Sequence, residues 1–203
     1  MTNLQEIEKE WETEYKNADI ENIPLQFLKP PSHLVKLVEA NKIKKGKILD
    51  IGCGLGVTDF YLSAKGFDVV GLDVSETAVE YAKKKSAQMK LKCEFVKGFA
   101  QDLKFPEKSF TFVFDRGCFH HIEQEDRKKY IEGVHRVLED GGKYYLECFN
   151  EKNQKELFAH KFSKEEIEKY FSKKFKILCI EETENIDVDG EKVYLYTVFM
   201  EKI

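Results

Sequence analysis

Apolar residues recur along this chain with two periods, one typical of helices and one typical of strands. Residues 4–17 place Leu4, Ile7, Trp11 and Tyr15 at helical spacing, which predicts an amphipathic helix. From Lys47 onward, short apolar runs alternate with amphipathic segments. The predicted strands are 47–51, 68–73, 92–96, 110–114, 143–149, 174–183 and 191–201. The other predicted helices are 56–65, 76–89, a short one near 118–122, 126–139 and 163–171. A further helix is predicted after Ser32, which would be its N-terminal cap, and Ser75 is the predicted cap of helix 76–89.

The order of these elements predicts the fold class. Strands that alternate with helices form parallel sheets that helices cover on both faces. The last two strands have no helix between them, and the turn sequence Asp187-Val188-Asp189-Gly190 joins them as a hairpin that adds one antiparallel strand. We therefore expect an α/β fold with a seven-stranded, mostly parallel sheet. No linker divides the sequence, so residues 1–203 are expected to form one domain, with a helical cap at 1–45 and an α/β core at 46–203.

Composition and charge narrow the class of protein. The chain has 203 residues and a formal net charge of -4, with acids and bases mixed throughout. Without a basic stripe we expect no nucleic-acid partner, and without a long apolar run or a signal peptide we expect no membrane contact. The five cysteines are widely separated and form no C-x-x-C pair. These features favour a cytoplasmic protein with reduced thiols, no metal site and a small-molecule substrate, as a monomer or homodimer.

The segment KILDIGCGLGVTDFYLSAKGFDVVGLDVS, from Lys47 to Ser75, carries the strongest functional signal. It runs from a strand through a glycine-rich loop and a helix to a second strand that ends in Asp73. Glycines let a backbone turn sharply and lie close against a ligand. An acid at the end of the second strand is placed to accept hydrogen bonds from ribose hydroxyls. The segment therefore predicts a nucleoside-binding site.

The glycine spacing separates two classes of nucleoside cofactor. A dinucleotide fingerprint, G-x-G-x-x-G, requires a third glycine where this chain has Val57, which weighs against the competing class, the nicotinamide-dependent oxidoreductases. The motif D-I-G-C-G-L-G instead resembles motif I of the class I S-adenosyl-L-methionine (SAM) methyltransferases. That resemblance implies a Rossmann-like sheet and SAM as the cofactor. The cofactor-binding residues that we expect are Trp11, Asp50, Gly52, Cys53, Gly54, Asp73, Val74, Phe99, Ala100 and Asp115.

The loop after the third strand departs from the pattern of that family. Many SAM methyltransferases have G-D-A there, and the acid hydrogen bonds the adenine amino group. Here Phe99 stands in place of the acid, between Gly98 and Ala100. Adenine could lie against Phe99 and bond to the backbone amide of Ala100, or Asp102 could supply the acceptor. Alternatively, Phe99 belongs to the core and Asp102 to a turn.

The loop FDRGCFHHI, after the fourth strand, holds the candidate catalytic residues Asp115, Arg116 and His121. Methyl transfer from a sulfonium needs alignment and an electron-rich acceptor more than acid catalysis. Asp115 could face the positive end of the cofactor, and Arg116 offers a planar fork to an anionic partner. His120 or His121 could act as a general base. The alternatives are a structural salt bridge for the arginine and packing or capping for the histidines.

Across its length the chain resembles bacterial and archaeal members of the thiopurine and thiol S-methyltransferase-like group. The markers are W-x-x-x-Y at Trp11 and Tyr15, a proline-bounded segment, ILDIGCGLG, GLDVS, FDRGCFHHI and a late F-S-K-E-E. One departure is Pro24-Leu25, where relatives often have Pro-Trp. The resemblance implies that Arg116 lies beside the substrate and that Trp11 helps to cover the cofactor.

From the motifs and the resemblance together we expect a SAM-dependent methyltransferase. Its acceptor is expected to be a small molecule, with a thiol or another soft heteroatom as the atom that is methylated. The alternatives are an O- or N-methyltransferase of a small metabolite and a non-catalytic SAM-binding protein.

Overall fold

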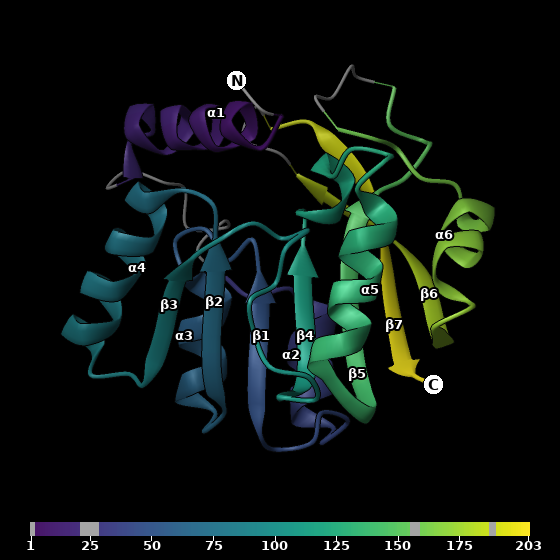
Figure 1. The fold of residues 1–203 in the computed structure, drawn as a ribbon, viewed down its shortest axis with the longest axis horizontal. Helices are drawn as coiled ribbons and strands as arrows, with labels where there is room; N and C mark the ends of the chain where they lie inside the picture. Colours follow the sequence, from purple (N-terminus) through teal and green to yellow (C-terminus); the bar gives the residue numbers. More distant parts are fainter. Residues whose placement is uncertain (1–2, 21–28, 155–158, 187–189) are drawn as a thin grey trace. The chain divides into compact units, whose positions relative to one another are not determined.

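The computed structural model describes residues 3–20, 29–154, 159–186 and 190–203 (Figure 1). The helices are α1 Asn3–Asn17, α2 Ser32–Glu39, α3 Val57–Ala64, α4 Glu76–Met89, η3 Phe119–His121, α5 Arg127–Val137 and α6 Lys164–Phe171. The strands are β1 Lys47–Ile51, β2 Asp68–Asp73, β3 Cys93–Lys97, β4 Phe110–Arg116, β5 Leu138–Phe149, β6 Phe175–Ile186 and β7 Lys192–Lys202. Their order in the sheet is β3-β2-β1-β4-β5-β7-β6, and β7 runs antiparallel to both its neighbours. This mixed, mostly parallel sheet confirms the predicted fold class.

The chain divides into two compact units, Met1–Ala100 and Gln101–Ile203. In the first unit β1, β2 and β3 form a parallel ladder. Four of the five residues of β1 and five of the six of β2 are buried, as near-continuous apolar runs predict for strands covered on both faces. Helix α1 lies across the upper end of α4, above the carboxyl ends of β2 and β3 (Figure 1). The carboxyl ends of these strands and the glycine-rich loop therefore lie on the side that α1 occupies.

Two predicted helix caps have different outcomes. Ser75 caps α4, because its side chain accepts a hydrogen bond from the backbone N–H of Ala78 at 3.2 Å. Ser32 is not a cap: it is the first residue of α2, and the residue before it is Pro31, which carries no side-chain acceptor. The prediction for Ser32 was therefore wrong by one position.

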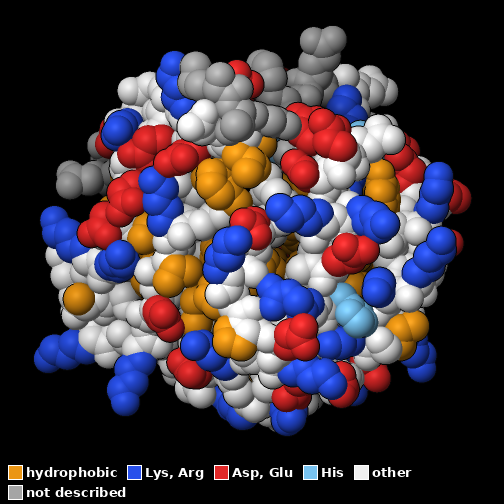
Figure 2. Space-filling model, viewed as in Figure 1, with side chains coloured by type: hydrophobic (Ala, Val, Ile, Leu, Met, Phe, Trp, Pro, Cys, Tyr) orange, Lys and Arg blue, Asp and Glu red, His pale blue; other side chains and the backbone are white. Residues whose placement is uncertain are grey.

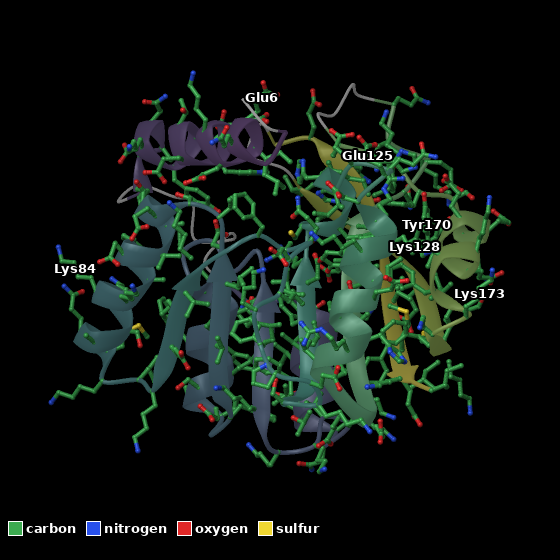
Figure 3. All side chains as sticks on the ribbon, viewed as in Figure 1. Glu6, Lys84, Glu125, Lys128, Tyr170 and Lys173 are labelled. Carbon is green, nitrogen blue, oxygen red and sulfur yellow. The ribbon has the colours of Figure 1, made fainter. Side chains whose placement is uncertain are left out.

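In the second unit β5 pairs with β4 in parallel and with β7 in antiparallel register. The predicted helix 126–139 ends earlier, at Val137, and β5 begins at Leu138 with a register shift against β4. Gly141, with φ +71°, permits this irregular start of the strand. Arg127 donates a hydrogen bond to the hydroxyl of Tyr170 at 3.2 Å, which ties α5 to α6. Tyr170 is labelled in Figure 3.

The surface carries both signs of charge. Figure 2 shows lysine and acidic side chains interspersed over the visible face, without a continuous basic field. Within the described ranges, no helix combines the length and apolarity needed to cross a membrane. The predicted turn 187–190 lies outside the described residues except for Gly190, and Pro24-Leu25 lies outside them entirely. The single-domain organisation, the oligomeric state and the cytoplasmic location stay predictions.

Candidate cofactor and acceptor sites

The glycine-rich loop closes tightly over the end of β2. The backbone N–H groups of Gly52 and Cys53 both donate to the carbonyl of Leu72, at 2.8 and 3.1 Å. Gly54 has φ +52°, and a Cβ atom there would lie 2.6 Å from the Tyr15 hydroxyl oxygen. A side chain at position 54 is therefore disfavoured by the backbone conformation, and it would displace the Tyr15 hydroxyl. A glycine-rich loop that follows a parallel strand is the usual place for a nucleoside cofactor.

Asp73 lies where the sequence predicts a ribose-binding acid. Its side chain is buried, and one carboxylate oxygen accepts from the Gly54 N–H while the other accepts from the Ser75 N–H, both at 2.9 Å. Burial raises the pKa of this carboxyl, and the backbone hydrogen bonds oppose that shift. Each oxygen keeps a second lone pair, so the group can still accept hydrogen bonds from two hydroxyls. Val74 follows at the half-buried start of the next loop.

Two further acids lie under the same loop. Asp50 and Asp59 are both buried, and no described N–H or O–H donates to either oxygen of Asp59. Burial raises the pKa of Asp59 to about 7, and the neighbouring Asp50 side chain opposes that shift. Burial and the neighbouring acids also hold the pKa of the Cys53 thiol well above its usual range. The resulting negative potential suits a ligand that carries positive charge.

The remaining cofactor candidates lie on α1 and in the loop after β3. Trp11 and Tyr15 lie one helical turn apart on α1, with ring centroids separated by 6.4 Å. Phe99 is half-buried and Ala100 is buried at the end of the loop after β3. Asp102, in the second unit, forms an exposed ion pair with Lys104 at 2.8 Å, which matches the turn interpretation. Among the described residues, no group of three or more His, Cys, Asp or Glu side chains is arranged to hold a metal ion.

In the second unit Asp115 organises the loop after β4. The carboxylate is fully buried and accepts from the N–H of Cys118 at 2.8 Å, from the N–H of Phe119 at 3.1 Å and from the Tyr130 hydroxyl. Burial raises the pKa of Asp115 to about 7, and the Tyr130 hydroxyl is the largest influence in the opposite direction. Three donors from its own unit thus fix the conformation of the D-R-G loop.

Arg116 forms an ion pair with a buried acid that the sequence alone did not single out. Its Nε atom lies 3.3 Å from Oε2 of Glu147, whose side chain is only 4% exposed. The other oxygen of Glu147 accepts from the Tyr145 hydroxyl and, at 3.4 Å, from Thr197. No described residue bonds to the terminal guanidinium nitrogens of Arg116, and the side chain is 33% exposed. The Nε side of the guanidinium therefore faces Glu147, and its two terminal nitrogens can donate hydrogen bonds to a ligand.

His120 has a fixed protonation state. Its Nδ1 accepts a hydrogen bond from the Phe149 N–H at 3.1 Å, so the ring proton resides on Nε2. The ring stacks on Phe149 with centroids 4.1 Å apart, and burial together with His121 lowers the pKa of His120 well below 6.5. His120 is consequently a neutral donor. His121 is half-buried, with its ring 4.6 Å from that of His120.

Comparison with known proteins identifies the family. A family described as "Methyltransferase domain" matches residues 48–142. An uncharacterised methyltransferase of Synechocystis is 39% identical over 49% of this chain and 45% of its own length. A 2-heptyl-1-hydroxyquinolin-4(1H)-one methyltransferase of Mycobacteroides abscessus is 29% identical over 73% of this chain and 66% of its own length. An uncharacterised methyltransferase of Schizosaccharomyces pombe is 30% identical over 59% of this chain and 82% of its own length.

The chain thus spans less than two thirds of the length of several curated relatives.

Solved structures share its fold. A protein from a study of the conversion of a disulfide bond into a thioacetal group in echinomycin biosynthesis superposes with a TM-score of 0.83 at 22% identity, over 97% of this chain and 92% of its own. A SAM-dependent methyltransferase of Methanosarcina mazei gives a TM-score of 0.76 at 23% identity, over 86% and 99%. On the strength of these relatives, the chain belongs to the class I SAM-dependent methyltransferase family.

Proposed function

We propose that this chain transfers the methyl group of SAM to a small-molecule acceptor, with a thiol or another soft heteroatom as the preferred acceptor. The observation that carries this proposal is Arg116: its guanidinium forms an ion pair with buried Glu147, and among the described residues no partner is recorded for its terminal nitrogens. Such a fork stabilises an anionic acceptor, or a carboxylate on the acceptor. We extend the proposal to the predicted roles of Asp115 and His121, and to Trp11, Val74, Phe99 and Ala100 as cofactor contacts.

The residues present fit the cofactor. Glycine at position 54 suits the left-handed backbone of the loop, and Asp73 keeps lone pairs for ribose hydroxyls. When bound, SAM supplies a sulfonium-activated methyl group. The chain itself orients the nucleoside through Asp73 and the loop, stabilises negative charge on the acceptor through Arg116, and offers one neutral N–H from His120.

A thiol acceptor matches a site without a strong base. A thiol with a pKa of about 8.5 is already a few per cent thiolate at neutral pH, so alignment and charge stabilisation suffice. Since Nδ1 of His120 already accepts a backbone hydrogen bond, this ring is a poor proton acceptor. The arrangement therefore favours a soft, partly ionised nucleophile over an alcohol.

The second candidate is O- or N-methylation of a small metabolite. The names of two relatives support it: one acts on a hydroxyquinolone and one is a cypemycin N-terminal methyltransferase, 32% identical over 60% of this chain. In that case His121, the half-buried histidine of the pair, would be the candidate base.

An assay of S-adenosylhomocysteine (SAH) release across matched thiols, phenols and amines tests the proposal. We expect turnover with thiols, loss of turnover in Arg116→Ala, and little change in the control Lys128→Ala, which alters an exposed residue of α5. If His121→Ala abolishes turnover of a phenol or amine while Arg116→Ala leaves it intact, the second candidate is correct. Tight SAM binding without turnover of any acceptor would indicate a non-catalytic binding protein.

A further inference from the structure

Helix α1 is joined to the start of α4 by one carboxylate, that of Glu12. One of its oxygens accepts from the Ser75 hydroxyl at 2.7 Å and from the Thr77 N–H at 3.1 Å. The other oxygen accepts from the Thr77 hydroxyl at 2.8 Å and lies 3.1 Å from Nζ of Lys16. Burial alone would raise the pKa of Glu12, but these hydrogen bonds outweigh it and lower the pKa to about 2. Glu12 is therefore ionised at any physiological pH.

The same helix places an aromatic hydroxyl against the cofactor loop. The Tyr15 hydroxyl lies against Gly54: a Cβ atom added at Gly54 would be 2.6 Å from the hydroxyl oxygen. Tyr15 lies one helical turn from Trp11. In sheets of this kind ligands bind beyond the carboxyl ends of the strands, and α1 lies across that end of β2 and β3 (Figure 1). The position of α1 thus decides how open the cofactor loop is.

A continuous series of hydrogen bonds connects Glu12 to the ribose-binding acid. Ser75 donates its hydroxyl to Glu12 and its backbone N–H to Asp73, and Asp73 accepts in turn from the Gly54 N–H. A further link between α1 and the rest of the unit is the ion pair of Glu8 with Lys97 at 2.7 Å, whose side chains are more exposed than that of Glu12. Exposed pairs contribute little, so we expect this ion pair to hold α1 less firmly than the hydrogen bonds of Glu12.

We infer that Glu12 is a positioning residue that holds α1 over the cofactor loop and so sets how long SAM and its product SAH stay bound. The inference rests on the proposed use of SAM. Ligand leaves the loop through an opening of α1, and each opening breaks the hydrogen bonds of Glu12 to Ser75 and Thr77. Weakening these bonds raises the frequency of opening, which increases the dissociation rate without removing any group that contacts the reacting atoms.

The chain supplies its own probe and a matched control. Trp11, next to Glu12, is its only tryptophan, so tryptophan fluorescence reports on α1 alone. Glu6 is exposed on the same helix and points away from the sheet (Figure 3), so Glu6→Gln makes the same chemical change without touching α4. Thr77→Val removes one hydroxyl donor to Glu12 and leaves the carboxylate in place.

The experiment is stopped-flow displacement of SAH, monitored by Trp11 fluorescence, together with the thermal midpoint of each variant. We expect Glu12→Gln to raise the SAH dissociation rate about tenfold or more, since hydrogen bonds to charged groups are among the strongest. Thr77→Val should give a smaller increase, Glu6→Gln none, and the unliganded thermal midpoints should stay close together. A dissociation rate for Glu12→Gln within twofold of the parent, with SAH still bound, overturns this inference alone. Failure of the parent protein to bind SAH overturns it together with the proposed function.

Discussion

Asp59→Asn should stabilise this protein at high pH and leave it nearly unchanged at low pH. In the folded chain, burial raises the pKa of Asp59 from 3.8 to about 7, whereas the unfolded chain loses this proton near pH 4. Between these values the folded state binds more protons than the unfolded state, so the free energy of unfolding falls as pH rises. The shift corresponds to a penalty of about 4 kcal/mol at pH 8 and about 1 kcal/mol at pH 4.5, at roughly 1.4 kcal/mol per pKa unit.

Asparagine removes this penalty because it is neutral at every pH and its amide can donate to Asp50. Urea unfolding followed by circular dichroism at pH 4.5 and pH 8 measures the difference. We expect Asp59→Asn to gain roughly 2–3 kcal/mol more at pH 8 than at pH 4.5. Asp68→Asn, an exposed position at the start of β2, is the control and should show no such difference. An equal effect of Asp59→Asn at both pH values would refute the reasoning.

Three further predictions concern the cofactor and acceptor sites. Asp73→Ala should weaken SAM binding by about 1–3 kcal/mol, measured by isothermal titration, because ribose hydroxyls lose their acceptor. Gly54→Ala should weaken SAM binding, because a side chain at φ +52° strains the loop and displaces the Tyr15 hydroxyl. Gly66→Ala, with φ +80° and its nearest neighbour at 3.7 Å, adds backbone strain outside this loop and should bind SAM like the parent protein. Arg116→Lys keeps the charge but loses the fork, so kcat/KM for thiols should fall about tenfold; an unchanged value would argue against bidentate contact.

Local patterns predicted the elements of this chain well. The strands at 47–51 and 68–73 have the predicted bounds, and the Ser75 cap is present, because apolar runs and capping chemistry depend on neighbouring residues. The sequence did not predict that α5 ends at Val137. The helix ends there because Leu138 pairs with β4, a strand more than twenty positions earlier in the chain.

The candidate sites were predicted less completely, because their decisive contacts join distant segments. Glu147 meets Arg116 only through the pairing of β4 with β5, where the two residues are register partners. Glu12 is one of several acids on an amphipathic helix, and its sequence neighbours do not distinguish it from Glu10 or Glu14. The tautomer of His120 depends on the backbone N–H of Phe149, which no motif encodes.

The position of β7 has a consequence for the synthesis of the chain. β7 follows β6 in sequence but lies between β5 and β6 in the sheet. Until the ribosome has added residues 192–202, β7 is missing. During this time one edge of β5 is unpaired, and β6 has no strand to pair with. Unpaired strand edges are templates for wrong association. Charged residues on a strand edge oppose such association, and β6 carries several, among them Lys176, Glu181, Glu182 and Glu184.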